Sequence, residues 1–62
     1  MKKYKGKLIY LPHDKAYWLI DPINPTNFLT RAYGPPALLE QLMKKRQVEV
    51  VIGKESYSIQ AV

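Results

Sequence analysis

The sequence contains no cysteine, which excludes a disulfide framework and a thiolate metal site. It has a single histidine, His13 beside Asp14 in a predicted turn, and this pair offers too few ligands to hold a metal. The three glycines are isolated, so no glycine-rich phosphate loop is present. The five acidic residues are scattered without the paired spacing typical of acid–base catalysis. We therefore expect a protein that is not an enzyme and that uses neither a metal nor a cofactor.

Long hydrophobic segments are also missing. The lysine-rich N-terminal residues are followed only by the short apolar run Leu8–Leu11, which is too short for a signal sequence. No segment approaches the roughly 20 apolar residues that a membrane-spanning helix needs. These features predict a cytoplasmic protein without a membrane partner.

Positive charge is what the chain has in excess. Ten Lys and Arg residues against five Asp and Glu residues give a net charge of +5 on 62 residues. A small basic domain attracts polyanions, of which nucleic acid is the commonest in the cytoplasm. The same lysines could serve solubility alone. The length indicates one domain, residues 1–62, which we expect to be a monomer or a weak dimer.

The first half of the chain predicts two strands joined by a turn. Residues Tyr4–Leu11 alternate in polarity as a strand does, with Gly6 indicating a bulge or a bend. Pro12–Lys15 has the composition of a turn, and Ala16–Ile20 is rich in aromatic and branched residues that favour a second strand. The segment Asp21–Asn27, with two prolines and two asparagines, predicts a loop.

A short third strand over Phe28–Tyr33 and a helix beginning at Gly34-Pro35-Pro36 follow. Proline suits the first helical turn because its missing N–H has no intrahelical partner there. The apolar residues Leu38, Leu39, Leu42 and Met43 would fall on one side of this helix, with Glu40 near its start and the basic run Lys44–Arg46 at its end.

The last third predicts a hairpin. Val48–Ile52 and Tyr57–Ala61 alternate in polarity, and Gly53-Lys54 is expected to form a two-residue type II′ turn that places Val50 beside Tyr57. The order is therefore three strands, a helix and two strands (β-β-β-α-β-β). This is the order of a mostly β, five-stranded OB-type barrel, whose closure would remove exposed sheet edges.

Pairing the first two strands across their turn divides the hairpin into two apolar faces. The tyrosine face would carry Leu8, Tyr10, Tyr17 and Leu19, and the tryptophan face would carry Ile9, Leu11, Ala16, Trp18 and Ile20. We assign the tryptophan face to the core, because it contains a tryptophan and branched aliphatic residues with no charge among them. The tyrosine face, edged by Lys15, would then be exposed for stacking on unpaired bases. Alternatives are that both faces are buried, one of them under the helix, or that a bulge at Gly6 exchanges them.

Four motifs extend this interpretation to a family. Gly6–Leu11 reads G-K-L-I-Y-L, where the cold-shock domain family has G-K-V-K-W-F, and Lys15–Ile20 reads K-A-Y-W-L-I beside its K-G-F-G-F-I. Asn27–Ala32 is a looser counterpart of D-V-F-V-H-F. Gln47–Gly53, with the closing Gln60–Val62, resembles the family's G-Q-x-V-x-F-x-V-x-x-G and Q-A-x-x-V. The chain thus resembles cold-shock proteins, small OB-fold domains that bind single-stranded RNA and DNA.

The resemblance implies site residues. The family's stacking tryptophan falls on Tyr10, its two surface phenylalanines on Tyr17 and Leu19, and its motif lysine on Lys15. In the third strand, a loop shorter by one residue puts the family's phenylalanine and histidine at Leu29 and Arg31, which we prefer. A loop shorter by two residues would put them at Phe28 and Thr30.

These residues predict non-enzymatic binding of single-stranded nucleic acid, RNA or DNA, in the manner of an RNA chaperone or a regulator of transcription or translation. Phosphate contacts are expected from Lys7, Lys15, Arg31 and Lys54. The alternative is a small regulatory or phage-type inhibitor that uses the barrel against a protein partner, since fold does not fix function. A ribosome-associated or duplex-coating basic protein is a third possibility.

Overall fold

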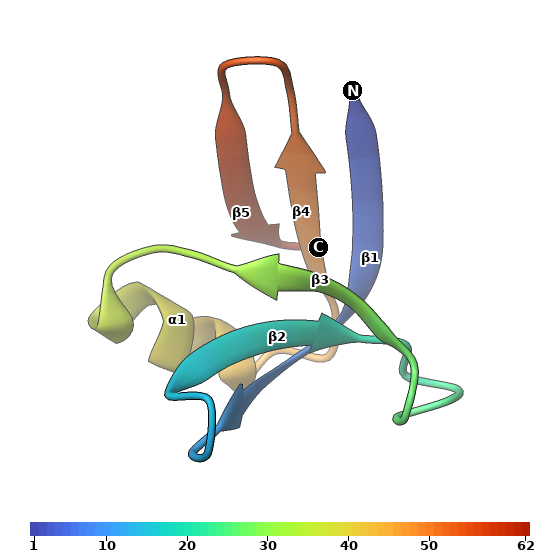
Figure 1. The fold of residues 1–62 in the computed structure, drawn as a ribbon, viewed down its shortest axis with the longest axis vertical. Coiled ribbons are helices and arrows are strands. Elements are labelled where there is room, and N and C mark those ends of the chain that lie inside the picture. The colour runs from blue at the N-terminus through green and yellow to red at the C-terminus, as the bar shows by residue number, and fades with distance from the viewer.

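The computed structural model describes residues 1–62 and contains the predicted elements in the predicted order (Figure 1). The elements are β1 Lys2–Leu11, β2 Ala16–Ile20, β3 Phe28–Ala32, α1 Pro36–Met43, β4 Val48–Ile52 and β5 Tyr57–Ala61. The segment Asp21–Asn27 is a loop, as predicted. No helix is long and apolar enough to cross a membrane.

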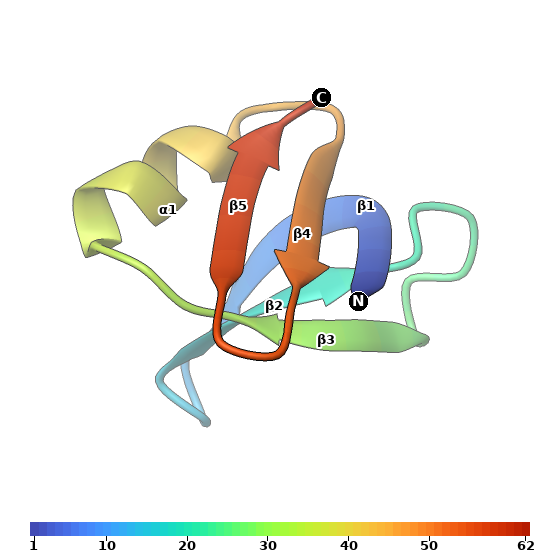
Figure 2. The same cartoon turned by 90° about the horizontal axis from the view of Figure 1, so that it is seen from above.

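The five strands form one antiparallel sheet in the order β3-β2-β1-β4-β5. The long strand β1 pairs with β4 through its first half and with β2 through its second half. As a result, the β4–β5 hairpin and the β2–β3 hairpin run across each other (Figures 1 and 2). The edge strands β3 and β5 are not paired, so the predicted barrel closure is not confirmed. Beside these edges, the backbone N–H of Tyr33, just after β3, donates to the Tyr57 hydroxyl at 2.8 Å, and the two tyrosine rings lie 5.7 Å apart.

Gly6 is the point at which β1 changes partners, which agrees with the bend predicted there. A Cβ at this position would lie 2.1 Å from the carbonyl oxygen of Ile20. Real side-chain carbons do not approach a backbone oxygen so closely, so only glycine lets β1 bend this tightly against β2.

The pairing of β1 with β2 confirms the predicted register from Leu8 opposite Leu19 to Leu11 opposite Ala16. Residues 12–15 form the turn, in which the N–H of Lys15 donates to the carbonyl of Pro12 at 3.3 Å. Lys15 has a positive φ of 50°, the left-handed conformation that closes the turn.

The assignment of the two hairpin faces was wrong. Leu8 and Leu19 are only 1% and 0% exposed, and the tyrosine face, not the tryptophan face, packs under α1. The core cluster consists of Leu8, Leu19, Ala32, Leu39, Leu42, Val48 and Val50. On the tryptophan face Ala16 and Ile20 are buried as predicted, but Ile9, Leu11 and Trp18 lie outside this cluster and are half-exposed. The core lies on the side that the helix and β4 cover, and this depends on tertiary packing that the hairpin pattern does not contain.

Strand β3 contains an irregularity that neither predicted register allowed. Leu19 pairs with Thr30 whereas Ile20 pairs with Phe28, so Leu29 is an extra residue opposite the bond between Leu19 and Ile20. Such a bulge interrupts the alternation of side chains. Phe28, at 43% exposure, therefore lies outside the core. Leu29 packs against the core cluster.

The final hairpin keeps its predicted apolar face but not its predicted turn. Ile52 pairs with Tyr57 and Val50 with Ile59, so residues 53–56 form a four-residue connection instead of a two-residue type II′ turn. Gly53 does not have the positive φ that a type II′ turn requires. The register differs from the prediction by two residues, and a shift of two leaves every side chain on its expected face.

Helix α1 begins at Pro36, and Leu39 and Leu42 are its buried residues. Its first turn has no acidic residue and its last turn no basic one, so Glu40 and the run Lys44–Arg46 are not placed as expected to complement the helix dipole. Lys7 of β1 takes that role instead. Its ammonium group donates to the carbonyls of Met43 at 2.5 Å and Lys45 at 2.8 Å, where the helix ends.

Candidate nucleic-acid interface

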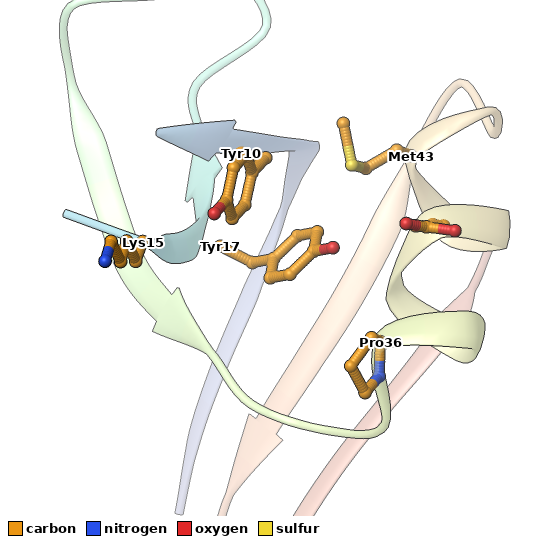
Figure 3. A pocket seen from close by; sticks show the side chains of 6 residues that line it. Tyr10, Lys15, Tyr17, Pro36 and Met43 are labelled. Atoms are coloured by element: carbon orange, nitrogen blue, oxygen red, sulfur yellow. The ribbon is translucent and has the colours of Figure 1, made fainter. Parts of the chain in front are cut away.

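A single open pocket of about 540 Å³ lies between the β1–β2 hairpin and helix α1. Its volume is within the range of about 300–1,000 Å³ that is usual for small-molecule sites. Six residues line it, three from the hairpin and three from the helix: Tyr10, Lys15, Tyr17, Pro36, Glu40 and Met43. The pocket therefore brings together the end of β1, the start of β2 and one side of α1 (Figure 3).

Two tyrosine rings form the hairpin side of this pocket. The centroids of Tyr10 and Tyr17 are 4.8 Å apart, with the ring planes tilted by 54°. The two residues are opposite each other across the β1–β2 pair, which is why the rings touch. Tyr10 is 39% exposed and Tyr17 is half-buried, so aromatic surface faces the solvent at this end of a face that is otherwise core.

The surroundings of the Tyr17 hydroxyl favour its neutral form and so raise its pKa. Burial raises the pKa of Tyr17 above its usual value, and the negative charge of Glu40 and the neighbouring Tyr10 add to the increase. The Tyr17 phenol therefore keeps its proton to a higher pH than a free tyrosine does.

The charged residues of the pocket lie on different elements. In Figure 3, Lys15 lies at the hairpin end, across the two tyrosine rings from Pro36 and Met43 of the helix. Glu40 belongs to the helix side, and its carboxylate makes no hydrogen bond or ion pair. The only ion pair in the protein joins Lys5 to Glu49 at 3.8 Å, outside the pocket. The pocket therefore has a cation on the hairpin and an unpaired anion on the helix.

Three of the eight predicted site residues, Tyr10, Lys15 and Tyr17, come together in this pocket. Leu19 is fully buried and cannot stack on a base, which corrects the prediction for that residue. Leu29 is partly buried against the core and does not line the pocket.

The predicted phosphate-binding residues are dispersed. The ammonium group of Lys7 is engaged at the end of α1. Arg31 is exposed but lies over the ring of Tyr33, 5.4 Å from its centroid, instead of lining the pocket. Lys54 is exposed in the β4–β5 connection, at the opposite end of the molecule from the β1–β2 turn (Figure 1).

Sequence reasoning missed the outer face of the β1–β2–β3 region as a surface. Ile9 pairs with Trp18, and Trp18 with Arg31, in one row across the three strands. Trp18 and Phe28 make an edge-to-face contact there, with centroids 5.6 Å apart at 84°. The indole N–H of Trp18 is shielded from solvent and has no acceptor. The sequence places Phe28 at a surface position only in the alternative register, which also places Thr30 there. The bulge at Leu29, which exposes Phe28, leaves no signal in the local pattern.

Glu40, Pro36 and Met43 were not predicted as site residues either. They lie on the helix, 19 or more positions from Tyr17 in sequence, and nothing in the local pattern places α1 beside the hairpin turn.

Comparisons with protein-family models, with curated proteins and with solved structures gave no match. The resemblance to the cold-shock domain therefore has no support beyond the motifs themselves.

Proposed function

We propose that this protein binds single-stranded nucleic acid, RNA or DNA, without catalysing a reaction, and acts as an RNA chaperone or as a regulator of transcription or translation. The observation that carries the proposal is the pocket in which the Tyr10 and Tyr17 rings lie 4.8 Å apart with Lys15 beside them. The net charge of +5 favours a polyanionic partner.

The strand order supports an OB-type description of the sheet. In β3-β2-β1-β4-β5 the long first strand pairs with both hairpins, and closing β3 onto β5 would complete a five-stranded barrel. We propose that the protein is an open form of this barrel, in which the Tyr33–Tyr57 hydrogen bond substitutes for backbone pairing between the edges. A relationship to cold-shock domains is likewise a proposal, and the four sequence motifs are its support.

Stacking explains why the partner should be single-stranded. An unpaired base exposes a flat face that can lie against a tyrosine ring, and such contacts are worth about 1–3 kcal/mol per base. Paired bases in a duplex do not expose that face. The ammonium group of Lys15 would neutralise a phosphate of the same strand, and the exposed run Lys44–Arg46, directly after the pocket residue Met43, adds positive charge nearby.

The test is a fluorescence anisotropy titration of labelled single-stranded and double-stranded oligonucleotides of equal length. The wild-type protein should bind the single strand more tightly, and the Tyr10→Leu, Tyr17→Leu double variant should lose tenfold or more in affinity through the lost stacking. Circular dichroism must show that the variant is folded. Equal binding by the folded double variant and the wild type would falsify the proposal.

Two lysines of the chain provide a matched charge control. Lys15→Gln and Lys54→Gln each remove one exposed positive charge, but only Lys15 lines the pocket. Replacing Lys15 should reduce the slope of log affinity against log salt concentration by about 0.7, the value for one phosphate contact on a single strand. Replacing Lys54 should leave that slope unchanged.

The outer face favours a second candidate, a small regulatory or phage-type protein that binds another protein. Ile9, Leu11, Trp18 and Phe28 are all partly exposed in this region, which has the apolar and aromatic character of a protein contact. A second copy of the chain is the partner that can be tested directly, by sedimentation equilibrium of the wild type and of Phe28→Glu. Dimerisation that Phe28→Glu abolishes and that added salt leaves unchanged would favour this candidate, and an exclusively monomeric wild type would remove that support.

A further inference from the structure

The carboxylate of Glu40 is out of place in a site for a polyanion. It is the only anion among the six residues that line the pocket. It lies on an exposed position of α1 and has neither a hydrogen bond nor an ion pair, although the chain carries ten basic residues. A negative charge at this position repels phosphate, so its presence calls for a part of the ligand that donates hydrogen bonds.

A carboxylate imposes a particular requirement on its ligand. An ionised Glu only accepts hydrogen bonds, and its two oxygens lie side by side. It is therefore best satisfied by two parallel N–H donors on adjacent atoms, which is the arrangement that makes bidentate pairs strong. A ligand with an acceptor next to a donor offers it only one bond and places a second lone pair against a negative oxygen.

Among the four RNA bases, only guanine has this arrangement on its Watson–Crick edge. Its N1–H and its 2-amino group are adjacent donors. Adenine and cytosine each place an amino donor beside a ring acceptor, and uracil has one N–H between two carbonyl acceptors. Recognition of unpaired bases commonly combines stacking on aromatic side chains with hydrogen bonds to this edge.

The layout of the pocket fits the polarity of a nucleotide. Lys15 lies at the hairpin end, the two tyrosine rings lie in the middle, and the helix that carries Glu40 forms the other side (Figure 3). A guanine stacked on the rings with its Watson–Crick edge toward α1 would direct its phosphate away from Glu40 and toward Lys15. The anion and the cation of the pocket then contact the donor end and the phosphate end of the same nucleotide.

We infer that this pocket selects guanine among unpaired bases, with Tyr10 and Tyr17 stacking on the base and Glu40 accepting hydrogen bonds from its N1–H and 2-amino group. The inference rests on the proposed function, since it concerns which base the same pocket takes. A bidentate contact of this kind discriminates between bases by about 1–3 kcal/mol, which is roughly fivefold to more than a hundredfold in affinity.

The experiment compares three labelled uridine nonamers whose central, fifth position is guanosine, inosine or uridine. Inosine differs from guanosine only in lacking the 2-amino group, so it stacks similarly but provides one donor fewer. Wild-type protein should bind the guanosine strand at least fivefold more tightly than the all-uridine strand, with the inosine strand in between. The Glu40→Gln variant should lose this order, because an amide offers a single acceptor oxygen. Its binding of the all-uridine strand should be unchanged or slightly tighter.

Glu55→Gln is the matched control, because Glu55 is an exposed carboxylate in the β4–β5 connection and does not line the pocket. It should retain the guanosine preference. Equal binding of the three strands by the wild type, or an unchanged preference in Glu40→Gln, would overturn the inference. In that case tyrosine-dependent binding of all three strands would still support the proposed function, whereas no binding of any strand would overturn both.

Discussion

Replacing Leu19 and Leu11 by alanine tests which face of the hairpin is the core. The two leucines lie on adjacent strands of the same hairpin, but on opposite faces. Leu19 is 0% exposed and belongs to the core cluster, whereas Leu11 is half-exposed on the outer face. Identical side-chain deletions at the two positions should therefore have very different effects on stability.

The expected size of the effect follows from burial. Fully buried Leu→Ala replacements cost about 2.7–5 kcal/mol, because contacts are lost and a cavity remains. For Leu11→Ala we expect about 1 kcal/mol, since part of its surface is already in contact with water. A chain of 62 residues has a free energy of unfolding of roughly 3–9 kcal/mol, so Leu19→Ala removes a large fraction of it.

The assay is urea unfolding followed by circular dichroism. With a slope of about 1 kcal/mol per molar urea, Leu19→Ala should lower the midpoint by about 3 M or leave the protein unfolded in buffer. Leu11→Ala should lower it by about 1 M. A loss of stability in Leu11→Ala equal to or greater than that in Leu19→Ala would refute the assignment of the core to the face under α1.

Three further predictions concern single contacts. Gly6→Ala should lower the free energy of unfolding by about 2 kcal/mol in urea titration, because the new Cβ would meet the Ile20 carbonyl at 2.1 Å; an unchanged midpoint would contradict the close approach. Lys7→Met keeps the aliphatic stem but removes the ammonium group at the end of α1, and should cost about 1 kcal/mol. Lys5→Met, which breaks a single 3.8 Å ion pair whose lysine is exposed, should cost less, and an equal cost would argue against the capping role. Burial raises the pKa of Tyr57, so the unfolded chain loses its phenol proton first and stability should fall above about pH 10; Tyr57→Phe should make that fall shallower, and an equally steep fall would contradict it.

The order of elements and the pairing of the first hairpin were predictable because they depend on short-range signals. The turn Pro12–Lys15 fixes which residues of β1 and β2 are opposite each other, and so places Tyr10 beside Tyr17. The pair Pro35-Pro36, at the N-cap and the first helical position, likewise marks where the helix begins. These signals act within a few residues and need no knowledge of the rest of the fold.

The choice between the two hairpin faces was not predictable in this way. Both faces carry apolar side chains, so the alternation in β1 and β2 gives two equivalent solutions. The choice depends on α1 and β4, which pack Leu39, Leu42 and Val48 against Leu8 and Leu19. The absence of charge on the tryptophan face predicts a core face, yet Trp18 is large enough to remain half-exposed on the outside.

The candidate site also has one side that the sequence predicts and one side that depends on the tertiary fold. Tyr10, Tyr17 and Lys15 were predicted together because one turn joins them, and the structure places them in one pocket. The helix side of that pocket could not be anticipated, since the path of the chain from β3 to α1 determines it. The bulge at Leu29, which places Phe28 on the outer face, is likewise a property of pairing with β2.

An NMR titration tests the central claim, nucleic-acid binding in the pocket, most directly. Isotope-labelled protein is titrated with a short single-stranded oligonucleotide, and the shifts of the backbone amide signals are mapped on the structure. We expect progressive shifts at Tyr10, Lys15 and Tyr17 and along α1, with smaller changes on the outer face around Trp18 and Phe28. Shifts confined to the outer face, or no shifts at low salt, would contradict it.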